Sequence, residues 1–356
     1  MPKSTPQAAL LKASTPVPLS LFSDLITANH ILHQQKVLDG FGHISVRNPQ
    51  DPAKFFLSKS LAPALVADRE DIEEYLVEDG SPINKDAPKA YVERFIHSEI
   101  YKKYAEVHSV VHSHSEAVIP FSITSIPVSI ALQRCFCVSA FPYPFLQLRP
   151  VYHMASFLSP QAPVYDISLH YKSSSDPHTL LVTSPHLGAS LATGLHPNTL
   201  VSKTTSMIKN YITSSATPAT PYPSSSVILM RGHGFTAVAK GIEDAVFKAV
   251  YTCANAKIQT QASLMQGSFN LGFVGERFGA GEGEKGPAKR EEVKYLNDRE
   301  GKEAWASLEG SVERAWGGWC KEVELDGLYR NAMLEEEEDE EGDDGGYVAD
   351  VDDEGR

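Results

Sequence analysis

The chain has 356 residues, of which 42% are hydrophobic, and a formal net charge of −13 at pH 7. This length can bury a large core in one domain of about 250 residues with extensions. No stretch approaches the roughly 20 continuous apolar residues that a membrane span needs, and the acidity argues against nucleic-acid binding through a basic patch.

The two ends of the chain are predicted to lie outside the folded domain. Residues 1–17 contain prolines and serines but no apolar core with a cleavage site, which indicates a flexible leader and no signal peptide. The segment 333–356 holds 13 acidic residues against one basic residue, so we expect a disordered, solvated tail. The four cysteines form no disulfide framework, which predicts a reducing, cytoplasmic location.

The first chemical signal lies in "YVERFIHSEIYKKY". Its apolar spacing predicts an amphipathic helix that runs into the next strand. Glu93 and His97 are four residues apart and share a face near the start of this helix, where the helix dipole favours a carboxylate. Glu93 is therefore either a site residue or an ordinary first-turn glutamate on a solvated face.

The second signal is the H-x-H of "EVHSVVHSHSEAVIP". The run that begins at Val107 predicts a buried strand, on which His112 and His114 point to the same side about 7 Å apart. Two imidazoles held this way can share one metal ion. The alternative is a pair of polar residues at a strand end, each with a hydrogen-bond partner.

The third signal is His233, which Gly232 and Gly234 flank in a predicted tight turn. A short apolar strand, 227–230, precedes this turn, and a long helix is expected from about residue 242 to 265. A histidine on a glycine turn between a strand and a helix is predicted to be a site residue.

Three segments interrupt or extend this pattern. Residues 128–147 begin with Val-Ser and end with Gln, whose codons can carry the borders of an intron, so the segment is either a retained intron or a lineage-specific loop. Residues 209–226 are rich in Ser, Thr and Pro and predict a surface loop. Residues 271–332 predict a charged linker and a helical extension, from about residue 291 to 324, with tryptophans at helical spacing.

Taken together, the glutamate, the H-x-H 19 positions after it and the distant G-H-G resemble the class II aldolase/adducin family, over about residues 18–270. The resemblance implies an α/β fold of three α/β/α layers around a mostly antiparallel sheet. It also implies metal ligands at His112, His114 and His233, a catalytic acid/base at Glu93, and a homotetramer with sites at subunit interfaces.

The chemistry of these residues agrees with that resemblance. Three neutral imidazoles with an open coordination position suit a divalent metal, for which Zn²⁺ is expected and Mn, Co or Fe are alternatives. Such a metal acts as a Lewis acid toward an enolate that forms when a C–C bond breaks, by retro-aldol cleavage or by loss of CO₂.

The residues expected around the substrate depart from the sugar-phosphate aldolases that the family includes. His43 in "GFGHISVR" stands where asparagine is expected, and Tyr91 and Val92 replace two serines before the glutamate. The segment "FLSKSLAP" keeps Ser58 and Ser60 without a glycine. The amides and hydroxyls that would bind phosphate are largely replaced, so we expect a non-phosphorylated small-molecule carboxylate.

Three further residues are candidates with open alternatives. Arg47 and Lys59 are possible counter-charges for the carboxylate, or a structural arginine and a solvated lysine. His153 in "VYHMASF" is a possible substrate-facing acid, or a core histidine with a satisfied ring.

The string of motifs is most similar to the branch of the family that contains decarboxylases of hydroxy-aromatic acids and of ring-cleavage products. We therefore expect a metal-dependent lyase that decarboxylates a hydroxy, keto or hydroxy-aromatic acid. The alternatives are a retro-aldol lyase and a non-catalytic adducin-like interaction module, although such a module has no reason to keep Glu93 and all three histidines.

Overall fold

The structure is a computed structural model that describes residues 17–86, 90–124, 147–173, 177–196, 221–279 and 292–334. The predicted leader, the segment 128–147 apart from its last residue, most of the loop 209–226 and the tail after residue 334 therefore lie outside the described residues.

A seven-stranded sheet forms the centre of the fold, in the order β3-β2-β1-β4-β7-β6-β5. Neighbouring strands are antiparallel except for β5 and β6, which run parallel. The strands are β1 (His43–Arg47), β2 (Lys54–Ser58), β3 (Ile72–Leu76), β4 (Ser109–Ser113), β5 (Val164–Tyr165), β6 (Val227–Met230) and β7 (Gly234–Ala239). The mostly antiparallel sheet that the resemblance implied is confirmed.

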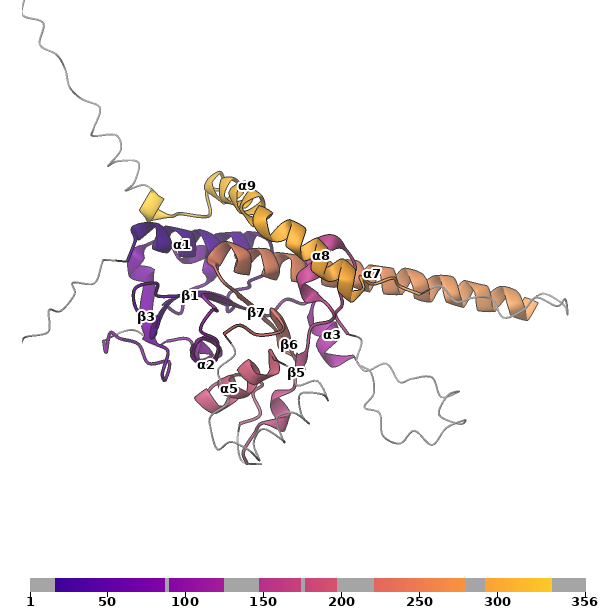
Figure 1. Cartoon of the computed structure of the whole chain (residues 1–356), viewed down its shortest axis with the longest axis horizontal. Coiled ribbons are helices and arrows are strands. Elements are labelled where there is room, and N and C mark those ends of the chain that lie inside the picture. Colours follow the sequence, from indigo (N-terminus) through magenta and orange to yellow (C-terminus); the bar gives the residue numbers. More distant parts are fainter. Residues whose placement is uncertain are drawn as a thin grey trace, which may run out of the picture.

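Helices cover both faces of this sheet (Figure 1). One face carries α1 (Leu19–Gln34) and α7 (Ile242–Gly279), and the other carries α2 (Arg94–Lys103) and α5 (Pro185–Gly194). Because both faces are covered, the central strands β1, β4 and β7 are buried along their whole length, polar residues included. Val111 packs into the α1/α7 core and its neighbour Val110 into the α2/α5 core.

The C-terminal extension is part of the same core. The predicted helical region is divided into α8 (Asp298–Leu308) and α9 (Val312–Glu324) by a short 3₁₀ turn. Trp305 of α8 packs edge-on against Phe157, with ring centroids 5.6 Å apart. Met333 is only 5% exposed and joins the α1/α7 core, so the first residue of the segment predicted to be a tail packs in the fold.

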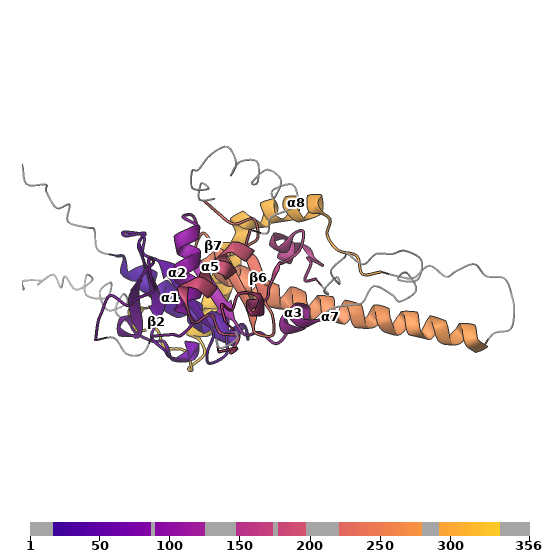
Figure 2. The same cartoon turned by 90° about the horizontal axis from the view of Figure 1, so that it is seen from below.

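Helix α7 continues to Gly279, well beyond the predicted end near residue 265. In both views it extends past the sheet as a long arm (Figures 1 and 2). The smaller helices complete the described elements: α3 (Ile119–Ile123) and 3₁₀ turns at Pro63–Leu65, Arg69–Asp71, His153–Leu158, Ile167–Leu169 and Glu309–Ser311.

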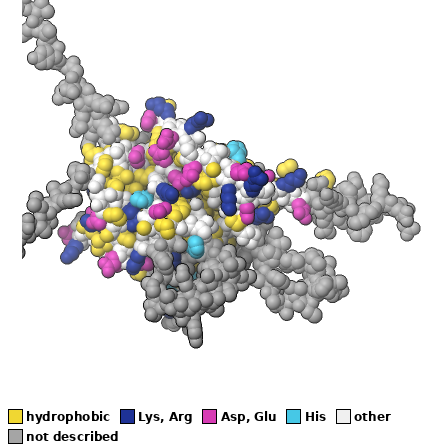
Figure 3. All heavy atoms as spheres, in the orientation of Figure 1, with side chains coloured by type: hydrophobic (Ala, Val, Ile, Leu, Met, Phe, Trp, Pro, Cys, Tyr) yellow, Lys and Arg dark blue, Asp and Glu magenta, His cyan; other side chains and the backbone are white. Residues whose placement is uncertain are grey.

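The visible surface carries charges of both signs. On the face shown in Figure 3, Lys and Arg side chains lie interspersed with Asp and Glu side chains over the described residues. Among those residues, no helix combines the length and apolarity needed to cross a bilayer.

Candidate metal centre

The centre of the sheet presents a row of polar side chains toward α2. His112 of β4 lies opposite His43 of β1 and opposite Thr236 of β7. Since residues directly opposite on neighbouring strands project from the same face, all three point into the α2/α5 side. Glu93 occupies the N-cap position of α2, at the end of the helix nearest this row.

His233 lies in the hairpin between β6 and β7. Gly232 has a φ of +65° and Gly234 a φ of +153°. Residues other than glycine rarely adopt these backbone conformations. A Cβ on Gly234 would lie 1.9 Å from the carbonyl oxygen of Ser113. The glycine therefore allows this hairpin to approach the end of β4, which brings His233 beside His114. Strand β7, which was not predicted, lies between this turn and α7.

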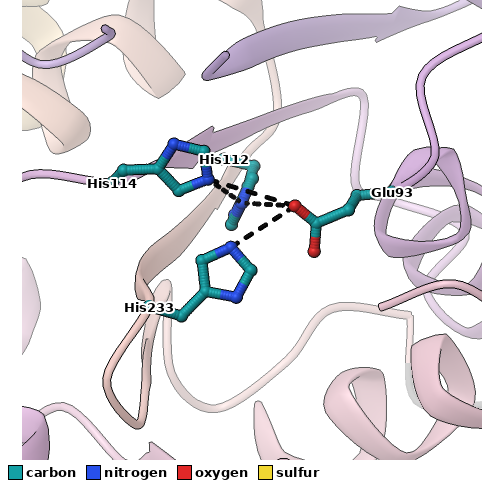
Figure 4. A group of neighbouring side chains, drawn as sticks. All are labelled: Glu93, His112, His114 and His233. Atoms are coloured by element: carbon teal, nitrogen blue, oxygen red, sulfur yellow. Dashed lines mark hydrogen bonds and ion pairs between the residues drawn. The ribbon is translucent and has the colours of Figure 1, made fainter. Parts of the chain in front are cut away.

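The four side chains converge on one point (Figure 4). Glu93 Oε2 lies 3.4 Å from His112 Nε2, 3.3 Å from His233 Nε2 and 4.0 Å from His114 Nε2. One ligand atom from each of the four residues lies within 4.8 Å of all the others. The grouping that the sequence predicted is thus present in space.

Outer hydrogen bonds orient all three rings in the same sense. His233 Nδ1 donates to the carbonyl of Leu180 at 2.9 Å, and His114 Nδ1 donates to the Asp39 carboxylate at 3.2 Å. His112 Nδ1 lies 3.4 Å from the hydroxyl of Thr236. With Nδ1 of each ring bonded outward, Nε2 faces the centre, which is the arrangement of metal-ligating histidines.

The Glu93 carboxylate is also held from outside. Its Oε1 accepts a hydrogen bond of 2.8 Å from the backbone N–H of Val182. Burial pushes the pKa of this carboxyl upward, but the three imidazoles outweigh burial and hold the pKa below its usual value. Glu93 is therefore ionised at neutral pH.

The electrostatics of the rings differ with their exposure. Burial lowers the pKa of His112, against the influence of Glu93, so this ring is neutral at pH 7. Burial also acts on His114, but the carboxylates of Glu93 and Asp39 outweigh it and raise the pKa.

These residues fit a divalent metal ion. His233 Nε2 is buried and lacks a well-aligned hydrogen bond, which is costly for a polar atom unless something binds it. Three imidazole nitrogens and one carboxylate oxygen form a donor set that suits zinc and its neighbours in the first transition row.

Other predicted substrate residues fall into two groups. His43 is 1% exposed and its ring centroid lies 5.2 Å from that of His112, so it belongs to the immediate surroundings of the cluster. Ser58 ends β2 and is buried, whereas Ser60 is exposed in the next loop and Lys59 is half-buried between them. Tyr91 links the cluster to this loop, because its ring packs on His43 and its hydroxyl donates a hydrogen bond to the Leu61 carbonyl.

Two candidates lie elsewhere. The Arg47 guanidinium donates to the backbone carbonyls of Pro52, Tyr101, Tyr104 and Val107, so it has a structural role and is not a counter-charge for a substrate. His153 is exposed on the 3₁₀ turn that packs in the α1/α7 layer, the side of the sheet opposite the cluster. The exposure of His153 contradicts the alternative of a core histidine, and within one subunit the residue lies away from the cluster.

Sequence reasoning missed the residues that support the cluster from outside. Asp39 and Thr236 are common polar residues without a motif, although Thr236 lies three positions after His233 on a predictable strand. Leu180 and Val182 act through their backbone groups, which carry no side-chain signal at all.

Comparison with known proteins agrees with this geometry. Residues 23–151 match the class II aldolase and adducin N-terminal domain. The decarboxylase tropJ of Talaromyces stipitatus is 37% identical over 321 residues, which cover 90% of this chain and 98% of that protein.

The chain belongs to the class II aldolase/adducin family. Solved structures of this family share its fold. The L-fuculose 1-phosphate aldolase of Glaciozyma antarctica superposes with a TM-score of 0.54 at 16% identity, covering 92% of this chain and 97% of that one. An aldolase II superfamily protein of Pseudomonas syringae has a TM-score of 0.52 at 15% identity, over 89% and 96% of the two chains. The chain is a lyase, and the adducin-like interaction module is set aside.

Proposed function

We propose that this protein is a divalent-metal-dependent decarboxylase of a non-phosphorylated hydroxy, keto or hydroxy-aromatic acid. The observation that carries the proposal is the 37% identity to a decarboxylase over nearly the whole of both chains. The convergence of Glu93 with His112, His114 and His233 supports it, because decarboxylation without an organic cofactor needs a place for the electron pair that CO₂ leaves behind.

The three histidines would hold the metal through Nε2. A divalent ion bound there supplies Lewis acidity toward the negative charge that develops on the substrate. Decarboxylation breaks the bond between a substrate carbon and its carboxylate, the electron pair stays on that carbon, and a proton must then reach it. Glu93 is the base beside the three rings, so it would accept a proton from a substrate hydroxyl and return it to this carbon.

The surroundings favour an unphosphorylated substrate. Near the cluster, His43 and Tyr91 fill buried space with rings whose centroids lie 4.6 Å apart. A phosphate would need several backbone amides or cations at this place, and the guanidinium of Arg47 is already bound to backbone carbonyls. A flat acid with one carboxylate needs fewer such partners.

Metal analysis combined with a substrate screen tests the proposal. The purified full chain is expected to contain about one divalent ion per subunit and to release CO₂ from a hydroxybenzoate-type or 2-hydroxy keto acid. His112→Ala should lose both properties, whereas His108→Ala, which changes an exposed histidine just before β4, should keep them. CO₂ release that persists both in metal-free wild-type protein and in His112→Ala would refute the proposal, and release of an aldehyde in place of CO₂ would identify a retro-aldol lyase.

A further inference from the structure

His114 is the most exposed of the three histidines in the cluster. Its side chain is 21% exposed, against 0% for His112 and 7% for His233. It also lies one residue beyond the end of β4, outside the paired residues of the sheet. The orientation of its ring therefore depends on the group that holds it from outside.

Asp39 holds this ring and a turn of the backbone with one carboxylate. Both carboxylate oxygens lie 3.2 Å from His114 Nδ1. Oδ1 also accepts hydrogen bonds from the backbone N–H groups of Phe41 and Gly42, at 2.9 and 2.8 Å. A carboxylate has lone pairs enough to serve three donors at once. One side chain thus bonds both to a candidate metal ligand and to the turn at residues 39–42.

This turn lies directly on the end of β4. Just before it, the Val37 carbonyl accepts a hydrogen bond of 2.6 Å from the Ser113 hydroxyl. A Cβ on Gly42 would lie 3.1 Å from the His112 carbonyl oxygen, a separation that few real Cβ atoms show, so the glycine permits this close approach. The connection from α1 to β1 is therefore held against β4 beside two of the candidate ligands, His112 and His114.

The position of the turn also bears on the wall of the site. The turn leads directly into β1, and the first residue of β1 is His43. The ring of His43 lies against that of His112, with centroids 5.2 Å apart. A shift of the turn would therefore reach the surroundings of the cluster as well as the ring of His114.

A carboxylate with two partners couples them to each other. With Nε2 bound to a metal ion, the His114 ring would be fixed, and it would keep the Asp39 carboxylate where the turn needs an acceptor. Coupling between two equilibria is reciprocal, so a closed turn favours metal binding by the same factor as bound metal favours the closed turn.

We propose that Asp39 is a positioning residue that couples metal binding at His114 to the turn at residues 39–42. Its carboxylate orients the ring for the metal and holds the turn on β4 at the same time. This inference rests on the proposed function, because it takes His114 as a metal ligand.

The metal dissociation constant of the full chain, measured with zinc by competition with a chelator, tests the support of His114. Asp39→Ala should raise this constant by about 10- to 100-fold, as is typical when the outer partner of a ligating histidine is lost. Asp39→Asn keeps an oxygen for the two N–H groups but loses the charge, so its constant should lie between those of Asp39→Ala and the wild type.

Asp51→Ala is the matched control. Asp51 is 42% exposed at its side chain, close to the 50% of Asp39, and it also accepts a backbone N–H in a turn, from Ala53 at 3.1 Å. That turn joins β1 to β2 at the end of β1 away from His43. Asp51→Ala should therefore leave the metal dissociation constant unchanged.

Hydrogen–deuterium exchange of the turn tests the coupling without any turnover. The amides of Phe41 and Gly42 are the donors to Asp39, so saturating zinc should slow their exchange several-fold in the wild type. In Asp39→Ala, saturated with zinc in the same way, the slowing should disappear because the shared acceptor is gone.

The outcomes separate this inference from the proposed function. If the wild type binds no divalent metal, both proposals fall. If the wild type binds zinc and both Asp39→Ala and Asp39→Asn bind it as tightly, or if zinc leaves the exchange of the wild-type turn unchanged, only the inference about Asp39 is overturned. Asp39→Asn retains an acceptor for the turn, so the comparison stands even where Asp39→Ala does not fold.

Discussion

Glu93 occupies the N-cap position of α2 without capping the helix. An N-cap side chain normally accepts a hydrogen bond from the first turn, which contributes about 1 kcal/mol. Here no such bond forms, and the two oxygens of the carboxylate face Val182 and the three histidines. The helix therefore lacks a side-chain cap, and the Glu93 carboxylate contacts the cluster instead.

Glu93→Gln is expected to lower kcat by about 10²- to 10⁴-fold, because the amide keeps the shape of the side chain and cannot transfer a proton. Metal content should stay near that of the wild type, since three imidazoles remain. The control is Glu99→Gln, a buried glutamate of the same helix that pairs with Lys102. If the kcat of Glu93→Gln stayed within a few fold of the wild-type value, proton transfer by Glu93 would be refuted.

His30 gives a prediction for stability against pH. Burial lowers the pKa of this ring to about 4, although the hydrogen bond from its Nε2–H to the Val66 carbonyl acts in the opposite direction. In the unfolded chain the ring keeps the ordinary pKa of 6.5. Above pH 6.5 both states are neutral and His30 has no effect. As the pH falls from 6.5 to 4, only the unfolded state takes up the proton, so the native state loses up to about 3 kcal/mol.

Denaturant titrations at several pH values between 7 and 4 check this effect. His30→Gln can still donate to the Val66 carbonyl but does not titrate, so its free energy of unfolding should fall less steeply across this window. His153→Gln, at an exposed position, should follow the wild type. Parallel curves for His30→Gln and wild type would contradict the assignment.

At the scale of elements, the loop that contains Leu180 and Val182 forms hydrogen bonds to both His233 and Glu93, which belong to different elements. Leu180 accepts from His233 of the β6–β7 hairpin, and Val182 donates to Glu93 at the start of α2. Leu180 has a φ of +63°, which costs about 1 kcal/mol or more for a residue other than glycine. Its N–H donates to the Tyr171 hydroxyl, so both of its backbone groups are fixed.

Tyr171→Phe removes the acceptor of the Leu180 N–H and should loosen this loop. Because the loop orients His233, the metal dissociation constant should rise several-fold, toward the 10-fold typical of changes outside the ligands themselves. Competition with a chelator measures this constant. Tyr222→Phe, which removes a hydroxyl that donates to the Val238 carbonyl, is the control and should leave it unchanged.

At the scale of the whole molecule, the described side chains of the α7 arm include several exposed apolar residues. Met265 is 74% exposed and Phe269 57%, and the two lie one helical turn apart, with Ile258 about two turns before Met265 on the same face. The predicted homotetramer would cover such a stripe with neighbouring subunits.

Light scattering of the full chain is expected to give four times the mass of one subunit. The double substitution Met265→Glu and Phe269→Glu should reduce that mass, because it places charges in the covered stripe. Gly267→Glu adds a charge to the same exposed arm on the side away from Met265, where an added side chain meets open space, and should leave the mass unchanged. A monomeric wild type would refute the homotetramer.

The residues of the metal centre could be predicted from the amino-acid pattern. His112, His114, His233 and Glu93 were readable because metal binding and proton transfer need particular side chains, and because strand and helix periodicity place neighbours in sequence on one face. The α/β/α layers were implied by the resemblance to the family.

The tertiary structure decided what surrounds these residues. The sequence left Arg47 as either a counter-charge or a structural residue, and its bonds to the carbonyls of Tyr101 and Tyr104 show the structural role. The position of His153 depends on the layer in which its 3₁₀ turn packs. The backbone groups of Leu180 and Val182 leave no trace in the sequence because every residue has them. Interactions made by the backbone, or by partners more than fifty residues away, depend on how the layers pack, and a linear pattern does not contain that information.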